Sequence, residues 1–382
     1  MNIGILGGGQ LGRMLALAGY PLGLRFRFFD PAPDAPVQHL GHHMVGDYAD
    51  NDALDRFADG LDLVTYEFEN VPVFAAQRVA ERVPVYPPPA ALESAQDRLA
   101  EKTFFQQLNI PTPPFLQVDS VTDLAAAVNR VGLPAVLKTR RLGYDGKGQY
   151  VIQTKDEVEK AWLTLTARGA TNPPRAGSGI LVGAKPLGLI LEKFIPFERE
   201  LSILAARGRD GATVFYPLIE NYHRDGILRL SLAPAPSLTY YLQAQAESFA
   251  TQAMDALNYV GVLTVELFLY EGHLIASEVA PRVHNSGHWT IEGAATSQFE
   301  NHLRALAGLP LGLTTPNGHM AMVNIIGSLP DTAQVLAMPG AHLHLYDKEP
   351  RPRRKLGHIT LLADDAERRD EQLAQLRSIY RD

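Results

Sequence analysis

The N-terminal part of the chain alternates between short apolar runs and stretches with helical spacing. The apolar runs, which are typical of buried strands, cover residues 2–6, 24–29, 63–66 and 83–86. Apolar side chains recur at helical spacing over residues 11–19, 52–58 and 73–81. This βαβ alternation predicts an open parallel sheet of the Rossmann-like kind.

The pattern changes at residues 84–92, PVYPPPAAL, because a run with four prolines cannot continue a sheet or a helix. We therefore expect a first domain at 1–97 and a small α+β lobe at 98–187. The helices of this lobe are expected at 96–108 and 155–167, and its strands at 134–139 and 150–153, with a Gly-rich loop at 140–149 between the strands.

The remaining residues, 188–382, have the pattern of an antiparallel α+β lobe. Two Asp-Gly pairs, Asp210-Gly211 and Asp225-Gly226, separate apolar runs and predict tight hairpin turns. The other elements expected here are strands at 262–270 and 274–280 and an amphipathic helix at 242–257. The strand expected at 188–195 has the pattern of the small α+β lobe, and the hairpins begin beyond it.

Composition limits the class of protein and its partners. With 382 residues, 46% of them hydrophobic and 20% charged, the chain is long enough for two or three domains with buried cores. No run approaches about 18 uninterrupted apolar residues and no leader pattern is visible, so we expect a cytoplasmic protein without a membrane partner. The net charge of -7 argues against nucleic-acid binding, and the lack of cysteine excludes disulfides and thiolate metal sites.

The segment GILGGGQLGR, residues 4–13, matches the dinucleotide-binding pattern G-x-G-x-x-G at Gly7, Gly9 and Gly12. Asp30 follows about 20 residues later, where an acid that binds ribose is expected. A nicotinamide-dependent oxidoreductase is therefore one hypothesis. The other is that the same turn starts a helix whose N–H groups face a different anion.

Glu266 and Glu278 lie within the last two predicted strands, among apolar neighbours where an unpaired carboxylate costs several kcal/mol. A three-residue hairpin loop at 271–273 would place the two glutamates opposite each other. A two-residue loop would shift the register by one, and the sequence does not choose between them. Side by side, the carboxylates favour a shared Mg²⁺ ion; the alternative is that each pairs with an Arg or a Lys.

Lys138, Lys193 and the Gly-rich loop indicate a phosphate site. Lys138 ends one predicted strand and Lys193 lies within another, so either ammonium group could reach a phosphate or simply extend to solvent. The loop GYDGKGQ, residues 143–149, adds backbone N–H groups and Lys147. It lacks the G-K-[ST] ending of a P-loop.

In their order along the chain, these features resemble the ATP-grasp superfamily. The resemblance is carried by Lys138, the Gly-rich loop, EKFI at 192–195, Glu200 and the late glutamate pair. Within the superfamily, GYDGKGQ, APRVHNSGHWT (280–290) and YDKEPRPRRKLGH (346–358) are similar to the aminoimidazole ribonucleotide carboxylases of purine biosynthesis. The resemblance implies a fold with α/β and α+β parts: an N-terminal Rossmann-like domain, a small central lobe with a Gly-rich lid, and a C-terminal lobe with the metal and ribonucleotide sites.

The resemblance also implies an activity and a set of site residues. It implies a homodimeric ligase that uses ATP and Mg²⁺ to carboxylate 5-aminoimidazole ribonucleotide with bicarbonate, through carboxyphosphate. The implied ATP contacts are Arg98, Lys138, Gly143, Tyr144, Asp145, Gly146, Lys147, Gly148, Gln149, Glu192, Lys193, Phe194, Ile195, Glu200 and His223. The implied metal ligands are Glu266 and Glu278, and Arg282 is expected to stabilise carboxyphosphate. The implied ribonucleotide contacts are Tyr144, Asp145, Arg282, His284, Lys348 and Arg354, with Asn285 and Ser286 in the same loop.

In this branch the Rossmann-like domain binds no dinucleotide, so the anion at the N-terminal turn is expected to be a substrate phosphate or carboxylate. Gln10, Glu67 and Glu69 lie where open sheets place ligands, and we expect Glu67 or Glu69 near the ribose or the amine. Ala280 departs from many ATP-grasp enzymes, which have Asn there, and this leaves one fewer oxygen for a second Mg²⁺.

A second ATP-grasp ligase, the formate-dependent glycinamide ribonucleotide transformylase, shares the N-terminal turn and the metal glutamates. HNSGH at 284–288 and the basic segment at 346–355 favour the carboxylase instead. The basic segment has cations suited to a nucleotide monophosphate at Lys348, Arg351, Arg353, Arg354 and Lys355.

Overall fold

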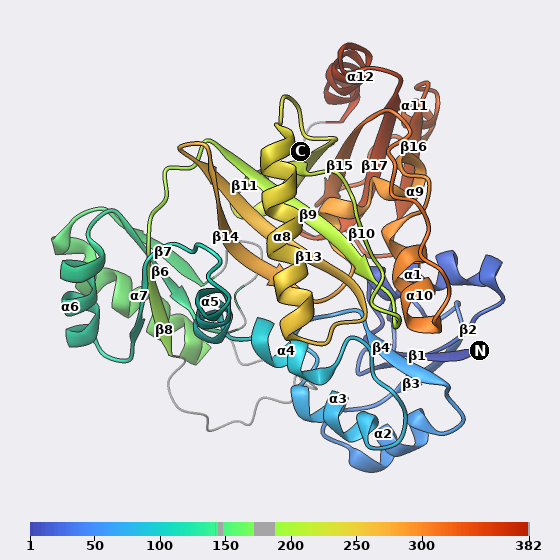
Figure 1. The fold of residues 1–382 in the computed structure, drawn as a ribbon, viewed down its shortest axis with the longest axis horizontal. Coiled ribbons are helices and arrows are strands. Elements are labelled where there is room, and N and C mark those ends of the chain that lie inside the picture. Colours follow the sequence, from blue (N-terminus) through green and yellow to red (C-terminus); the bar gives the residue numbers. More distant parts are fainter. Residues whose placement is uncertain (142, 144–147, 172–187, 381–382) are drawn as a thin grey trace.

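The computed structural model describes residues 1–141, 143, 148–171 and 188–380 (Figure 1). Among these residues the strands form three sheets, each with its own helices. No helix within these ranges is both long and apolar enough to cross a bilayer.

The first sheet is parallel, as the βαβ pattern predicts, and its strand order is β3-β2-β1-β4. Its strands are β1 (Asn2–Leu6), β2 (Arg25–Asp30), β3 (His42–Val45) and β4 (Leu63–Tyr66). Its helices are α1 (Gln10–Gly19), η1 (Tyr20–Leu22), α2 (Asn51–Ala58), α3 (Val73–Ala80) and α4 (Pro89–Ala95). Helix α1 packs with Ile3 and Ile5 on one face, and α2 and α3 pack with Leu6 and Val64 on the other.

Two predictions for this domain are wrong. Residues 83–86 form no strand but a single bridge between Val85 and Val64, because the flanking prolines at 84 and 87 donate no N–H group to a ladder. The second error is that strand β3, at the opposite edge of the sheet next to β2, was not predicted, because its half-exposed residues form no apolar run. The Pro-rich stretch also starts a helix, α4, because proline at the first helical position costs no hydrogen bond.

The small lobe is an antiparallel sheet of order β5-β8-β6-β7 with helices on one side. Its elements are β5 (Phe115–Val118), α6 (Val121–Val131), β6 (Ala135–Thr139), β7 (Gln149–Ile152), η2 (Lys155–Glu157), α7 (Val158–Thr171) and β8 (Leu189–Lys193). Its core includes Leu124, Leu137 and Leu191. The predicted lid residues Tyr144, Asp145, Gly146 and Lys147, between β6 and β7, lie outside the described residues.

The large antiparallel sheet has the order β14-β13-β9-β11-β12-β15-β17-β16, and β10 pairs with β9. Its strands are β9 (Arg199–Arg207), β10 (Thr213–Phe215), β11 (Ile219–Arg224), β12 (Ile227–Ala233), β13 (Gly261–Tyr270), β14 (His273–Ala280), β15 (His319–Ile326), β16 (Ala341–Leu345) and β17 (Lys355–Ala363). Both predicted Asp-Gly turns are confirmed, since one joins β9 to β10 and the other joins β11 to β12. The predicted helix at 242–257 is α8 (Tyr240–Ala256), which lies across the sheet and buries Phe249 and Met254 (Figure 1).

The other helices of this part are η3 (Asn285–Gly287), α9 (Thr290–Gly293), α10 (Gln298–Ala307), α11 (Thr332–Leu336) and α12 (Ala366–Ile379). Helix α10 packs against α1, and a shared core joins Ile3 to Val262 and Leu303. Helix α5 (Arg98–Gln107) lies between the small sheet and edge strand β14 (Figure 1). All three parts of the chain therefore meet near the β13–β14 hairpin.

Candidate active site

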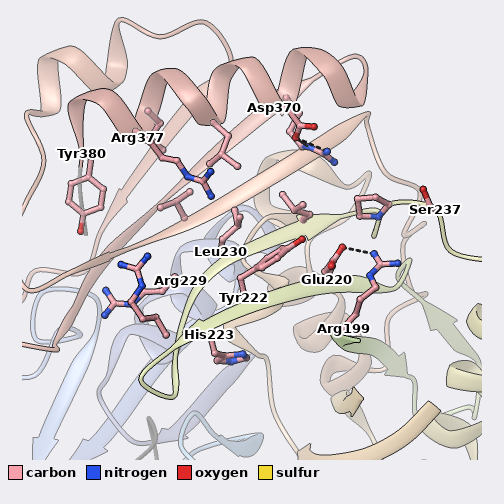
Figure 2. A pocket seen from close by; sticks show the side chains of 17 residues that line it. Arg199, Glu220, Tyr222, His223, Arg229, Leu230, Ser237, Asp370, Arg377 and Tyr380 are labelled. Atoms are coloured by element: carbon pink, nitrogen blue, oxygen red, sulfur yellow. Dashed lines mark hydrogen bonds and ion pairs between the residues drawn. The ribbon is translucent and has the colours of Figure 1, made fainter. Parts of the chain in front are cut away.

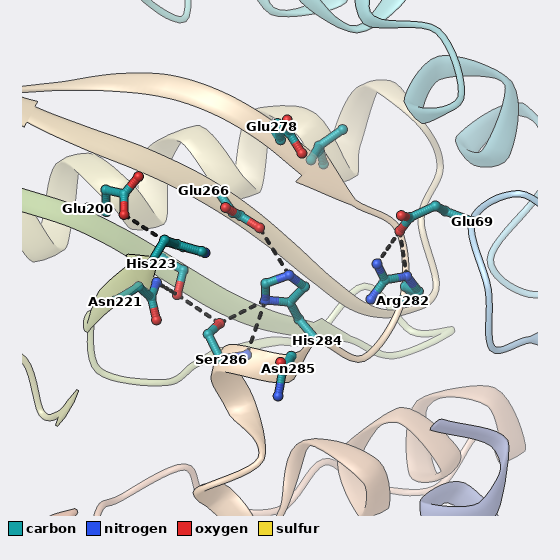
Figure 3. Close-up of polar contacts among 12 residues, drawn as sticks. Glu69, Glu200, Asn221, His223, Glu266, Glu278, Arg282, His284, Asn285 and Ser286 are labelled. Carbon is teal, nitrogen blue, oxygen red and sulfur yellow. Dashed lines mark hydrogen bonds and ion pairs between the residues drawn. The ribbon is translucent and has the colours of Figure 1, made fainter. Parts of the chain in front are cut away.

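The β13–β14 hairpin places Glu266 directly opposite Glu278 (Figure 3). The connection is the two-residue turn Glu271–Gly272, in which both residues have positive φ, 49° and 75°. A two-residue turn alone would oppose Glu266 to Ser277. A β-bulge before Leu267 absorbs that extra residue and restores the carboxylate pair. The sequence analysis left a two-residue and a three-residue loop open. The structure has the two-residue loop, but the glutamates lie opposite each other as expected for the three-residue loop.

The two carboxylates have different surroundings. Glu266 lies 3.0 Å from Nε2 of His284, whereas Glu278 is 44% exposed and lies 3.4 Å from Nη2 of Arg98. Burial alone would raise the pKa of Glu266, but the hydrogen bond and charge of His284, with His223 and Arg282, lower it to about 2. Glu266 is therefore held ionised, with a histidine as its ion-pair partner. The alternative, in which each glutamate pairs with an Arg or a Lys, holds for Glu278 with Arg98 but not for Glu266.

A polar chain fixes the orientation of His284 (Figure 3). Asn221 Nδ2 donates to Ser202 Oγ at 3.0 Å, and Ser202 Oγ donates to Ser286 Oγ at 2.9 Å. Ser286 Oγ lies 2.8 Å from Nδ1 of His284, which also accepts the backbone N–H of Ser286 at 3.3 Å. With Nδ1 turned to Ser286, Nε2 is the ring nitrogen that faces Glu266.

Cationic groups of the small lobe gather around Glu192 on β8. Lys138 Nζ lies 2.9 Å from its Oε2, and Lys102 Nζ lies 3.9 Å from the same atom. Burial would raise the pKa of Glu192, but Lys102, Lys138 and Arg98 together lower it to about 2. Within the described residues, Glu192 Oε1 and Arg98 Nε are buried without a hydrogen-bond partner, so polar atoms remain for a ligand.

The other predicted ATP contacts fall into two groups. Arg98 donates to the carbonyl oxygens of Thr139 and Gly143, at 3.0 and 3.3 Å, and so joins helix α5 to the start of the Gly-rich loop. Gly148 and Gln149 follow at the start of β7. Lys193 instead donates to the carbonyl oxygen of Leu133 at 3.1 Å, and Phe194 and Ile195 continue beyond β8.

Glu200 and His223 form a pair on the same face of the sheet as Glu266 (Figure 3). His223 Nδ1 lies 2.6 Å from Glu200 Oε2. Burial alone would lower the pKa of His223, but the hydrogen bond and charge of Glu200, with the charge of Glu266, raise it.

The described residues among the predicted ribonucleotide contacts come from distant parts of the chain. Gln10 at the start of α1 accepts a hydrogen bond from Lys348, 338 residues away. Arg282 is held by Glu69, to which its Nε donates at 2.6 Å. Arg354 donates to the carbonyl oxygen of Glu349 at 3.1 Å.

In the 284–288 loop, Asn285 is paired with a residue that the sequence analysis missed. Asn285 Nδ2 donates to Asn324 Oδ1 at 3.0 Å, and Asn324 Nδ2 donates back to Asn285 Oδ1 at 2.8 Å. Since Asn324 is fully buried on β15, this exchange anchors the loop to the sheet.

The N-terminal turn is occupied by a side chain of the same protein. Glu67 accepts hydrogen bonds from the N–H groups of Gly9, Leu11 and Gly12, at 2.8, 3.1 and 3.1 Å. The expected substrate anion at this helix start is thus replaced by a buried carboxylate that directly follows β4. Asp30 is engaged in the same way, because it accepts the N–H of Gly8 at 2.8 Å.

The cavity of about 830 Å³ in Figure 2 is a different place. It lies between β11, β12 and helix α12, and its lining includes Tyr222, Arg377 and the ion pair of Arg199 with Glu220. Among the predicted site residues only His223 contributes to its described lining. The carboxylate pair is therefore not in this cavity.

Two charged residues next to the site were not predicted. Glu101 and Lys102 on α5 are 3% and 1% exposed, and both contact β14. Burial raises the pKa of Glu101 to about 8, against the opposing effect of Lys102. Their position beside Phe105 on the buried side of a predicted helix was the available signal, since charged residues there need partners.

Comparison with known proteins agrees with this arrangement. A family model described as the ATP-grasp domain matches residues 103–299. The ribonucleotide synthetase preATP-grasp domain matches 1–96, and the phosphoribosylaminoimidazole carboxylase C-terminal domain matches 320–372. The fold and the site thus define an ATP-grasp ligase.

Individual relatives are more specific. The N5-carboxyaminoimidazole ribonucleotide synthase of Pseudomonas aeruginosa is 50% identical over 99% of both chains. The crystal structure of the corresponding synthetase from Thermus thermophilus is 57% identical, with a TM-score of 0.91, over 100% of this chain and 99% of that one. The chain belongs to the N5-carboxyaminoimidazole ribonucleotide synthase family.

One similar structure was solved with ligands. The N5-carboxyaminoimidazole synthase from Aspergillus clavatus, in complex with ADP and 5-aminoimidazole ribonucleotide, is 31% identical with a TM-score of 0.87. The alignment covers 99% of this chain and 98% of that one. This assignment replaces the oxidoreductase hypothesis and agrees with the Glu67-filled turn.

The lowered pKa of Glu192 predicts a pH-dependent stability. The pKa of Glu192 is about 2 in the folded protein and near its ordinary value of 4.5 in the unfolded chain. The ionised carboxylate therefore stabilises the fold fully above pH 4.5, and this stabilisation is lost as the pH falls towards 2. We expect the free energy of unfolding of wild type to exceed that of Glu192→Gln by a constant amount above about pH 5, and by less at lower pH. Urea unfolding across that range measures this, and a difference independent of pH would contradict it.

The glycines of the turn predict a second stability difference. A Cβ on Gly9 would lie 2.6 Å from Glu67 Oε1, whereas one on Gly12 would meet nothing closer than 3.5 Å. We expect Gly9→Ala to lower the free energy of unfolding by about 1–3 kcal/mol, because the carboxylate must move. Gly12→Ala is the matched control and should be neutral or stabilising in helix α1. Equal losses in both variants, measured by urea unfolding, would refute the fit of Glu67 to this turn.

Proposed function

We propose that this chain carboxylates 5-aminoimidazole ribonucleotide with bicarbonate at the expense of ATP, giving N5-carboxyaminoimidazole ribonucleotide, ADP and phosphate. The observation that carries the proposal is the opposition of Glu266 and Glu278 on neighbouring strands. On the small-lobe side Arg98 contacts Glu278 and Lys138 contacts Glu192, while Arg282, bonded to Glu69, acts on Glu266 through its charge. This arrangement suits a triphosphate on one side and a second anionic substrate on the other.

The donor set fits Mg²⁺. Glu266 and Glu278 offer carboxylate oxygens, and no group of three or more His, Cys, Asp or Glu in the described ranges forms a cage that could hold a metal ion without substrate. Magnesium commonly binds through one or two carboxylates together with phosphates of the substrate. When bound, the ion would neutralise charge that develops on the phosphates during transfer.

The residues around Glu192 suit ATP. Lys138 and Arg98 are cations for the phosphate chain, while the unpartnered Glu192 Oε1 can accept a hydrogen bond from a nucleotide amino or hydroxyl group. Glu200 and His223 lie on the sheet face that carries Glu266 and add further polar groups for the nucleotide. We assign ATP binding to these residues of the small sheet, helix α5 and the large sheet.

For the carboxyl transfer, a bicarbonate oxygen attacks the γ-phosphorus, the bond to the β-phosphate oxygen breaks, and ADP leaves carboxyphosphate behind. Arg282, oriented by Glu69, is assigned to stabilise the charge of this intermediate. Cleavage of carboxyphosphate releases phosphate and CO₂, and the exocyclic amine of the ribonucleotide attacks the CO₂ carbon and loses a proton. His284 is held against Glu266 and is assigned to contact bicarbonate or the amine.

The phosphate of the ribonucleotide is assigned to Lys348 and Arg354, with Gln10 as a neighbour of Lys348. Because the Glu67 carboxylate is engaged with three backbone N–H groups, we favour Glu69 as the acid nearer to the substrate. We also propose a homodimer, and 1–97, 98–187 and 188–382 as the functional divisions of the chain, although strand β8, after the second boundary, belongs to the sheet of the small lobe.

The substrate assignment is tested by phosphate release. With ATP and Mg²⁺, we expect release that depends on both bicarbonate and 5-aminoimidazole ribonucleotide. Formate with glycinamide ribonucleotide is the control for the related ligase and should give only background release. Release with formate and none with bicarbonate would overturn the assignment.

The metal role of Glu278 generates a separate prediction. Glu278→Gln removes the charge and keeps the shape, so phosphate release should fall by about 10²-fold or more, the scale of losing one electrostatic group in a transition state. ADP binding measured by calorimetry without a divalent ion should change little, because Glu278 is assigned to the ion and not to the nucleotide. Unchanged turnover would remove Glu278 from the metal site.

A further inference from the structure

The opposition of the two glutamates depends on one residue, Ser277. If the turn register continued without a bulge, Glu278 would lie opposite Val265, whose side chain is buried in the core under α8. A shift of one residue reverses the face to which every side chain of a strand points. The Ser277 bulge therefore turns Glu278 from the core face to the face of Glu266.

A bulge is costly at this position because β14 is the edge of the large sheet. Its outer N–H and C=O groups have no further strand to pair with, and the bulge interrupts the ladder on the inner side as well. Buried backbone groups need partners elsewhere.

Helix α5 supplies partners on both sides of Glu278. The N–H of Val279 donates to Oε1 of Glu101 at 2.6 Å, and Nζ of Lys102 donates to the carbonyl oxygen of Ser277. Ahead of the bulge, the N–H of Ala276 donates to the carbonyl oxygen of Pro111 at 2.7 Å. Two side chains of one helix thus hold the peptide groups that flank the metal carboxylate.

The same lysine also contacts the charged cluster around Glu192, to which we assign ATP binding. Lys102 Nζ lies 3.9 Å from Oε2 of Glu192, which Lys138 contacts at 2.9 Å. Lys102 therefore links the bulge in the large sheet with the charged cluster of the small lobe. Any movement of α5 would displace both groups together.

We propose that Glu101 and Lys102 are positioning residues that hold the Ser277 bulge, and through it keep the carboxylate of Glu278 opposite that of Glu266. Relaxation of the bulge to the regular register would break the bonds of the buried Glu101 and Lys102 side chains to the β14 backbone, which is costly for buried polar groups. The inference rests on the proposed function, because it treats Glu278 as a ligand of the ion.

The test compares Glu101→Leu, which removes the acceptor, with Glu101→Gln, which keeps an acceptor oxygen. Gln106→Leu, on the exposed side of the same helix, is the matched control. Binding of Mn²⁺ to the protein with ADP is followed by electron paramagnetic resonance, and amide hydrogen exchange of the Ser277–Val279 segment by mass spectrometry.

We expect Glu101→Leu to weaken Mn²⁺ binding by about tenfold or more, the usual scale for losing a residue that orients a metal ligand. Amide hydrogen exchange of the Ser277–Val279 segment should be faster in Glu101→Leu than in wild type. The affinity for ADP without metal should change by less than about twofold. Glu101→Gln and Gln106→Leu should bind Mn²⁺ like wild type. If Glu101→Leu does not fold, Lys102→Met replaces it, with the same expected loss.

Two results separate the two proposals. If Glu278→Gln weakens Mn²⁺ binding but neither Glu101→Leu nor Lys102→Met does, the positioning role is wrong and the metal site stands. If Glu278→Gln itself leaves Mn²⁺ binding unchanged, the metal assignment under the proposed function fails first. A loss in Glu101→Gln equal to that in Glu101→Leu would also overturn the positioning role.

Discussion

Two carboxylates of like charge, Glu266 and Glu278, are held side by side on adjacent strands, and the architecture of the site follows from that constraint. Such a pair repels unless cations or donors surround it. His284 faces one member and Arg98 faces the other, each from a different part of the chain. A divalent ion bound with a nucleotide would neutralise the negative charge of the two carboxylates that His284 and Arg98 offset only in part.

The need to surround this pair explains how the three parts of the chain meet. Helix α5 brings Arg98 to Glu278, and β4 ends near Glu69, which holds Arg282. The first helix and the C-terminal basic segment meet where Gln10 accepts from Lys348. Each contact joins segments far apart in sequence, so the binding groups act together only in the folded chain.

Local patterns predicted the elements well, because the periodicity of apolar residues and the Asp-Gly turns are local properties. The sequence also identified the glutamate pair and the cationic groups. It could not predict that Glu67 would fill the glycine turn, since the match between a carboxylate and N–H groups 55 to 58 residues away is tertiary. Strand β3 was missed, and the strand predicted at 83–86 was wrong, for a similar reason: pairing at the edge of a sheet depends on neighbouring strands more than on hydrophobicity. The hairpin register depended on a bulge that partners from another helix stabilise.

The central claim is that Glu266 and Glu278 share one divalent ion that holds the nucleotide phosphates. The most direct measurement is anomalous diffraction from a crystal grown with Mn²⁺ and ADP, at a wavelength near the manganese absorption edge. The account predicts a manganese peak within bonding distance of oxygens from both carboxylates and of an ADP phosphate. A nucleotide bound in the cleft with its manganese coordinated elsewhere, and both carboxylates turned to protein partners, would contradict it.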